Sequence, residues 1–355
     1  MEKNQHGKSW ANGLHTGRNI FKSIYNGGFG NGSAVFLSYF CSQSKLPVMS
    51  PKAVIDLGTN TCNLLIAKPD GRGDFITLLD NKFPVKMGRG GIHKKMLLPD
   101  AVERGIMAFE KHAKSIKNFG VEEVRIVATS AIRGATNREL FIAEIKNRFG
   151  WEIEVIDGKR EAELIFIGAT RMLPSVDGKY LIVDIGGGSN EFILAEHNKP
   201  IWKKSFNMGV ARTLEHFHVA DPPSTDDICQ IEAWYDTMLT ELFEICRFHC
   251  PKVIVGCSGA FDTFMDIWEK REPDATIRTP SYFPMVVLSD IQEKLIGCDA
   301  AARSRIPGMD RNRVEMVVIA AIFTRYIIQR LEIEQVIHTH FALKEGLMSE
   351  WLSIK

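Results

Sequence analysis

From Lys52 onward, short apolar runs alternate with amphipathic stretches, and this alternation is typical of an α/β protein. The run Ala53–Gly58 predicts a buried strand that ends in a turn, and Asn63–Ala67 predicts its hairpin partner. Residues 99–119 carry apolar positions at helical spacing and stop at Gly120. Further strands are expected at 74–86, 124–129, 152–156, 180–185, 191–196, 201–207 and 252–256, and further helices at 138–149, 159–169, 208–217, 225–248, 259–268, 289–297, 310–330 and 342–353.

The order strand, turn, strand occurs at the head of each half of the chain, once near Lys52 and again near Tyr180. A length of 355 residues suits two domains better than one core. Pro174–Gly178 combines turn-forming residues and predicts a linker. We therefore expect domains at 51–173 and 178–355, with the C-terminal helix able to pack back on the first domain.

Residues 1–50 differ from the rest of the chain, because they are rich in Gly, Asn, Ser and Lys and have no apolar periodicity. The sequence predicts an irregular or disordered tail here. Met49 stands just before the first strand, which suggests the hypothesis that the working chain starts there. Mass spectrometry of the native N-terminus tests it, and an intact peptide from residue 1 refutes it.

Composition narrows the range of partners. The net charge is +1, so no global field attracts nucleic acid or a membrane, and an anionic ligand needs a local site. The seven cysteines form no CxxC pair, which favours buried thiols in a reducing compartment over zinc ligation. No run of 18 apolar residues occurs, so we expect a cytoplasmic protein without a membrane span. The oligomeric state stays open, with a homodimer as one alternative.

Two acidic turns containing glycine, Asp56–Thr61 and Asp184–Ser189, follow predicted buried strands about one domain apart. Glycines let a backbone approach a phosphate, and hydroxyl groups add donors. The candidate phosphate-binding residues are Gly58, Thr59, Asn60, Thr61, Gly186, Gly187, Gly188 and Ser189, with Ser258 and Gly259 from a third turn. A carboxylate repels phosphate, so Asp56 and Asp184 require an intervening Mg²⁺ or water. The alternative is that these turns are merely tight hairpins.

Three segments carry a more specific signal: Ala128–Arg133, Ile156–Phe166 and Asp184–Glu191. With them, the chain resembles the exopolyphosphatase/guanosine pentaphosphate phosphohydrolase family of the actin-like ATPase superfamily, in its short two-domain form. The resemblance covers about residues 52–350 and implies an α/β fold of two actin-like (ribonuclease H-like) domains with an inter-domain cleft. Ordinary sugar kinases lack the helix that begins Glu161-Ala162.

The resemblance also implies roles for single residues. Glu161 matches the family's catalytic glutamate, which activates the attacking water, and Arg133 matches its phosphate-binding arginine. Asp184 and Glu191 match the acidic pair implicated in Mg²⁺ binding, to which Asp56 adds a third candidate metal ligand. The alternatives are a solvated glutamate in a first helical turn, a surface arginine and ordinary hairpin acids.

The implied activity is release of terminal phosphate from inorganic polyphosphate or guanosine pentaphosphate by water, with Mg²⁺ or another divalent cation. One alternative is a non-catalytic regulator that binds polyphosphate or guanosine tetra- or pentaphosphate. Another is an ATP-dependent kinase of the same fold, which fold alone does not exclude.

The chain departs from the family pattern at several positions. Asn190 and Ala260 stand where relatives often carry threonine, and His338–Phe341 replaces a Ser-Asp-Gly segment. His338 and His340 are two apart on one face of a strand, compatible with a metal site or with ordinary packing. A basic path for a polyanion, or simply a solvated face, is suggested by Lys86, Arg89, His93, Arg303, Arg305, Arg311 and Arg313.

Overall fold

The computed structural model describes residues 50–71, 74–273 and 278–353, all of which belong to one compact unit, Val48–Lys355. The expectations for the N-terminal tail and for a start at Met49 concern residues 1–49, which lie outside the described residues. Within the described ranges, no helix is both long and apolar enough to cross a membrane.

The first sheet has the strand order β3-β2-β1-β4-β5. Its strands are β1 (Lys52–Leu57), β2 (Thr61–Pro69), β3 (Phe75–Pro84), β4 (Glu123–Ala128) and β5 (Ile153–Val155). Strands β1, β2 and β3 form antiparallel hairpins, whereas β4 and β5 continue the sheet parallel to β1. The carboxyl ends of β1, β4 and β5 therefore meet at one edge.

The second sheet has the order β10-β11-β9-β6-β7-β8. Its strands are β6 (Lys179–Ile185), β7 (Asn190–Glu196), β8 (Lys199–Phe206), β9 (Val253–Cys257), β10 (Ser281–Phe283) and β11 (Gln335–Thr339). Strands β6, β7 and β8 form antiparallel hairpins, and β9 and β11 run parallel to β6. Apart from β10, this repeats the topology of the first sheet, so the expectation of one architecture used twice is confirmed.

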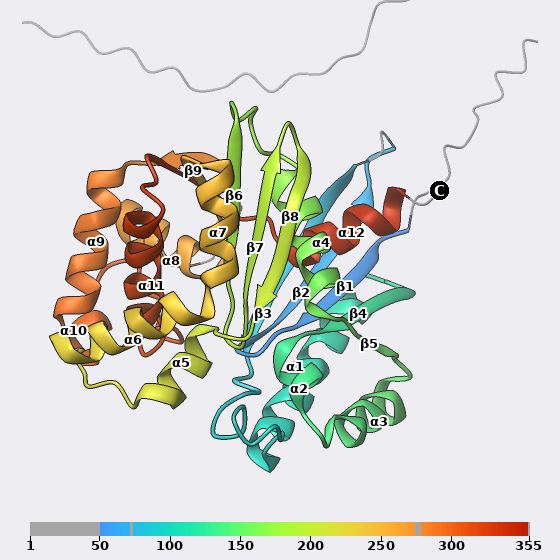
Figure 1. Cartoon of the computed structure of the whole chain (residues 1–355). Helices are drawn as coiled ribbons and strands as arrows, with labels where there is room; N and C mark the ends of the chain where they lie inside the picture. Colours follow the sequence, from blue (N-terminus) through green and yellow to red (C-terminus); the bar gives the residue numbers. More distant parts are fainter. Residues whose placement is uncertain (1–49, 72–73, 274–277, 354–355) are drawn as a thin grey trace, which may run out of the picture. The chain divides into compact units, whose positions relative to one another are not determined.

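Helices fill both outer faces and the space between the sheets (Figure 1). The helices are α1 (Pro99–Asn118), α2 (Ser130–Gly134), α3 (Arg138–Phe149), α4 (Gly158–Thr170), α5 (Val210–Phe217), α6 (Thr225–Met238), α7 (Thr240–His249), α8 (Gly259–Glu269), α9 (Met285–Gly297), α10 (Ala300–Arg303), α11 (Val317–Arg330) and α12 (Leu343–Ser353). Helices α1 and α3 share a core with the first sheet, and α6, α8, α9 and α11 share one with the second. Helices α4 and α12 contribute to the core between the sheets.

Helices α4 and α12 cross so closely that their backbones are in contact. A Cβ placed on Gly346 comes within 1.8 Å of the Leu164 carbonyl oxygen, and one on Gly168 comes equally close to the Ala342 oxygen. Only glycine fits such an approach. Helix α12, which also contacts β1 and β2, thereby fixes the position of α4.

Three helix boundaries were wrong, one of them the start of the helix expected at 289–297, which begins at Met285. The helix expected over 225–248 breaks at Leu239, where the Thr240 hydroxyl donates to the carbonyls of Asp236 and Thr237 and competes with the helical pattern. The helix expected from residue 310 begins only at Val317, because the Asp310 carboxylate accepts from the Asn312 N–H and stabilises turns there. The short elements α2, α10 and β10 were not expected.

Candidate active site

Matching hairpins carry the two acidic turns. Asp184 lies directly opposite Glu191 in the β6–β7 register, so both side chains emerge on the same face of the second sheet. Asp56 lies opposite Asn63 in the β1–β2 register, and the Asn63 amide donates to Asp56 Oδ2 over 2.9 Å. The pairing that the family resemblance implied for Asp184 and Glu191 thus has a direct geometric basis.

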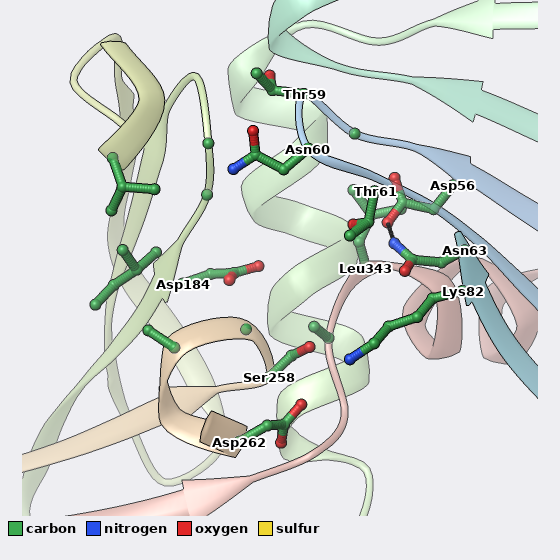
Figure 2. A pocket seen from close by; sticks show the side chains of 18 of the residues that line it. Asp56, Thr59, Asn60, Thr61, Asn63, Lys82, Asp184, Ser258, Asp262 and Leu343 are labelled. Carbon is green, nitrogen blue, oxygen red and sulfur yellow. Dashed lines mark hydrogen bonds between the residues drawn. The ribbon is translucent and has the colours of Figure 1, made fainter. Parts of the chain in front are cut away.

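A cavity of about 280 Å³ opens between the carboxyl edges of the two sheets. Figure 2 shows Asp184 and Lys82 entering it from opposite sides, with Ser258 and Asp262 close together along one wall. Residues expected at the site that line this cavity are Asp56, Gly58, Thr59, Asn60, Thr61, Glu161, Asp184, Gly186, Gly187, Gly188, Ser189, Glu191, Ser258 and Gly259. Sequence positions more than 200 apart therefore line the same cavity.

Glu161 lies in the first turn of α4, at the edge of the first sheet. Asp157 caps this helix, since its carboxylate accepts from the Arg160 N–H over 2.7 Å. Glu161 is only 6% exposed, and its Oε2 accepts from Arg133 Nη1 over 2.8 Å. The alternative of a solvated first-turn glutamate is therefore wrong.

Arg133 does not itself line the cavity but lies against Glu161. Its Nη1 donates both to Glu161 Oε2 and to the Ile156 carbonyl, 2.9 Å away. Helix α2 starts one residue after Thr129, which follows β4, so the arginine is attached to the edge of the first sheet. The ion pair holds the carboxylate of Glu161, which itself lines the cavity.

Four carboxyl groups, Asp56, Glu161, Asp184 and Glu191, form what we call the acidic cluster. Burial, reinforced by Glu161, Asp56 and Asp262, raises the pKa of Asp184 to about 8. Burial and then Asp184 raise the pKa of Glu191 to about 7, although the Ser205 hydroxyl opposes this by donating over 2.7 Å. Burial raises the pKa of Asp56 to about 6.

The pKa of Glu161 is also raised, first by burial and then by Glu191, while Arg133 opposes the shift. Crowded carboxylates resist simultaneous ionisation unless a cation compensates them. The acidic cluster therefore combines a group suited to accept a proton from water with a set of oxygens that favours a divalent cation.

The donor set suits Mg²⁺, which binds oxygen ligands and keeps several of its waters. Among residues 50–71, 74–273 and 278–353, no three His, Cys, Asp or Glu side chains converge closely enough to hold a metal alone. An ion beside Asp184 and Glu191 thus needs water and substrate phosphate to complete its coordination. This is the usual arrangement for Mg²⁺ at phosphoryl-transfer sites.

The glycine turns of the two sheets approach each other closely. A Cβ at Gly188 would lie 2.6 Å from both the Thr59 and the Ser130 hydroxyl oxygens, and one at Gly187 would collide with the Asn60 amide. The hydroxyls of Thr59 and Ser130 are buried and have no hydrogen-bond partner. Such unsatisfied donors are costly, and an incoming phosphate oxygen is the type of group that satisfies them.

The third turn precedes α8. Ser258 and Gly259 adopt positive φ angles of 42° and 51°, and the Ser258 N–H donates to the Thr339 carbonyl. A left-handed conformation is unusual for serine and indicates a backbone constrained by its surroundings. The turn directs Ser258 to the cavity beside Asp262 (Figure 2).

The sequence did not predict a charged cluster that lines the cavity and contains Asp262, His340 and Asp80. Asp262 Oδ1 lies 2.8 Å from His338 Nε2 and 3.2 Å from His340 Nδ1, while His340 Nε2 lies 3.5 Å from Asp80 of β3. Lys344 also pairs with Asp80, over 3.3 Å. The two histidines thus occupy a charged network that links both sheets, rather than a metal site of the described residues.

The expected basic path is only partly present. Lys86 and Arg313 line the cavity. Arg303 does not belong to it, because this residue is buried, and its side chain donates to Asp221 and to the carbonyls of Val314, Leu295 and Cys298. Its role is to hold the segment before α11, so its inclusion was wrong.

The Ppx/GppA phosphatase family model matches residues 65–354. The chain belongs to the Ppx/GppA phosphatase family. Its match covers the glycine turn of the second sheet, Glu161 and the His338–Phe341 segment. The family assignment made from the three sequence motifs is therefore confirmed.

Individual Ppx/GppA relatives cover most of the chain. Exopolyphosphatase 2 of Mycobacterium tuberculosis is 28% identical over 308 residues, which are 83% of this chain and 96% of that protein. The crystal structure of an exopolyphosphatase from Cytophaga hutchinsonii is 33% identical, covers 85% of this chain and 98% of its own, and superposes with a TM-score of 0.80. An Aquifex aeolicus Ppx/GppA family member, 23% identical with a TM-score of 0.69, shares the fold. The comparisons also bear out the actin-like fold.

Proposed function

We propose that this protein is a phosphohydrolase that releases terminal phosphate from inorganic polyphosphate by Mg²⁺-assisted attack of water. The observation that carries the proposal is a buried, raised-pKa Glu161 facing a cavity lined by three glycine turns. Relatives described as exopolyphosphatases, matched over most of their length, support the substrate class. Guanosine pentaphosphate is the second candidate, on the grounds of the family resemblance alone.

The residues divide the chemistry between the sheets. Backbone N–H groups and hydroxyls of the glycine turns hold phosphate oxygens, and Glu161 orients and deprotonates the attacking water. Asp184 and Glu191, paired across β6 and β7, would hold Mg²⁺. When bound, the cation supplies charge compensation to the phosphate oxygens. Arg133 keeps Glu161 in position through their ion pair.

Phosphate release with Mg²⁺ from short polyphosphate, long polyphosphate, guanosine pentaphosphate and ATP, measured side by side, tests this proposal. Release from a polyphosphate substrate and not from ATP supports it and ranks the substrates. Consumption of ATP that depends on a second substrate would indicate a kinase. Tight binding without any release would indicate a non-catalytic regulator.

A further inference from the structure

The segment between β11 and α12 leads from the second sheet to a helix that contacts β1 and β2 of the first, and its residue His340 lines the cavity. Just before it, the Thr339 carbonyl accepts from the N–H of Ser258 in the third glycine turn, over 2.8 Å. Just after it, the Ala342 carbonyl packs against Gly168 of α4. The segment therefore touches both the third turn and the helix that carries the candidate general base.

The imidazole of His340 lies between two carboxylates that belong to opposite sides of the cavity. Its Nδ1 is 3.2 Å from Oδ1 of Asp262, in the first turn of α8, and its Nε2 is 3.5 Å from Oδ2 of Asp80 on β3. A neutral imidazole has a single N–H and would turn a bare nitrogen toward one carboxylate, whereas an imidazolium donates toward both. Burial lowers the pKa of His340, but Asp262 and Asp80 outweigh burial and raise the pKa to about 10, while Lys344 opposes them. We call this cation and its two carboxylates the His340 bridge.

Asp262 connects the His340 bridge to the third glycine turn. Its backbone N–H donates to the Ser258 carbonyl over 3.2 Å, and its Oδ1 also lies 2.8 Å from Nε2 of the fully buried His338. Ser258 has a φ of 42°, a conformation that persists for serine where the surrounding structure enforces it. The position of this turn relative to β3 is therefore coupled, through Asp262 and His340, to Asp80.

The His340 bridge is shielded from solvent. The side chain of His340 is 12% exposed, that of Asp262 8% and that of Asp80 19%. Ion pairs in such surroundings are screened much less than surface pairs, so their attraction is larger. Without the imidazolium, Asp262 keeps His338 and Asp80 keeps Lys344, 3.3 Å away. Each carboxylate thus retains a partner on its own, and what is lost is the connection across the cavity through His340.

We propose that His340 is a positioning residue that sets the distance between the third glycine turn and the first sheet, and with it the spacing of the phosphate-binding groups on the two sides of the cavity. The inference rests on the proposed function. Among the described residues, the polar side-chain contacts of His340 are to Asp80 and Asp262 and not to Glu161, so its effect falls on binding of substrate rather than on attack by water. Without the bridge, a smaller fraction of the protein presents the turns at the binding distance, and the apparent affinity falls by that fraction.

The test compares His340→Gln with Asp80→Asn, which remove the cation and one of its anions. Each variant is expected to raise KM for short polyphosphate at least about 5-fold with a smaller change in kcat. The double variant is expected to raise KM by less than the product of the two single effects, because both changes remove the same bridge. His197→Gln, which removes an exposed imidazole from the turn between β7 and β8, is the control and should leave both constants unchanged. An unchanged KM in both variants, or strictly additive effects on its logarithm, would overturn the proposal.

Hydrogen exchange of the ligand-free protein separates positioning from a local structural role. Asp80 belongs to the first sheet, yet Asp80→Asn is expected to speed amide exchange around Ser258 and Asp262, which belong to the other side of the cavity. Inorganic tripolyphosphate with Mg²⁺ should slow that exchange again. Unchanged exchange at the third turn in Asp80→Asn would overturn the proposal, as would ¹⁵N NMR showing a neutral His340 imidazole at pH 7. Absence of phosphate release by the wild type contradicts the proposed function instead, and the exchange measurement still decides on the His340 bridge.

Discussion

Replacing Glu161 by glutamine isolates the proton-accepting role of this side chain. Glutamine keeps the volume and an oxygen that accepts from Arg133 Nη1, now 2.8 Å from the carboxylate, so the local geometry is retained. What is lost is the negative charge and the ability to take a proton from water. General-base catalysis contributes about 10²- to 10⁴-fold, so we expect kcat to fall at least about 100-fold, or about 2.7 kcal/mol.

The structure predicts that this loss occurs without unfolding. Glu161 is one of four crowded carboxyl groups, and burial raises its pKa, so its charge costs more free energy in the folded protein than in water. Removing the charge should leave the free energy of unfolding equal to that of the wild type or higher. Binding of tripolyphosphate with Mg²⁺ should persist, because the glycine turns are untouched.

The assay is initial-rate phosphate release together with chemical denaturation of the same preparations. Glu163→Gln is the matched control, since Glu163 lies on the same helix but is 34% exposed and pairs with Lys203 and Arg160. That control should retain near-wild-type turnover. Near-native turnover in Glu161→Gln itself would refute the catalytic role, and a large loss of stability would refute the electrostatic reasoning.

Three further predictions concern the acidic cluster and the packing around it. Folding raises the pKa values of the acidic cluster, so the native state binds more protons than the unfolded chain does at the same pH. Without Mg²⁺, the free energy of unfolding should therefore fall as the pH rises from about 5 to about 8, by about 1.4 kcal/mol per pH unit for each extra proton. Chemical denaturation at each pH measures this fall, and Mg²⁺ should make it less steep. A free energy of unfolding that does not change with pH contradicts this. Gly346→Ala should destabilise the protein by at least about 2 kcal/mol and lower its activity, because the added Cβ collides with the Leu164 carbonyl. A melting temperature equal to that of the wild type would disprove the contact. Arg303→Met should lower the free energy of unfolding by about 3 kcal/mol in denaturation experiments, because it leaves Asp221 and buried backbone carbonyls without their hydrogen-bond donor. An unchanged free energy of unfolding would argue against the buried network.

The sequence predicted those parts of the site that local patterns determine. A buried strand followed by an acidic glycine turn predicts a hairpin, and both hairpins form, with Asp184 opposite Glu191. The position of Glu161 in a first helical turn followed from the helix expected over residues 159–169 and from the family motif. Both signals lie within about ten residues, where the chain itself fixes the geometry.

Contacts between distant segments could not be predicted in this way. The network of Asp262, His340 and Asp80 joins α8, the end of β11 and β3, and the histidine spacing alone was equally compatible with packing or a metal. Arg303 was assigned to a surface path because a charge in a sequence gives no information on its burial.

Single-turnover hydrolysis of short polyphosphate in ¹⁸O-labelled water tests the central claim most directly. Attack of water on the terminal phosphorus predicts Mg²⁺-dependent release of orthophosphate, with one ¹⁸O atom in each orthophosphate released and none in the shortened polyphosphate. Orthophosphate without the label, phosphate transferred to another acceptor, or binding with no release at all would contradict the account.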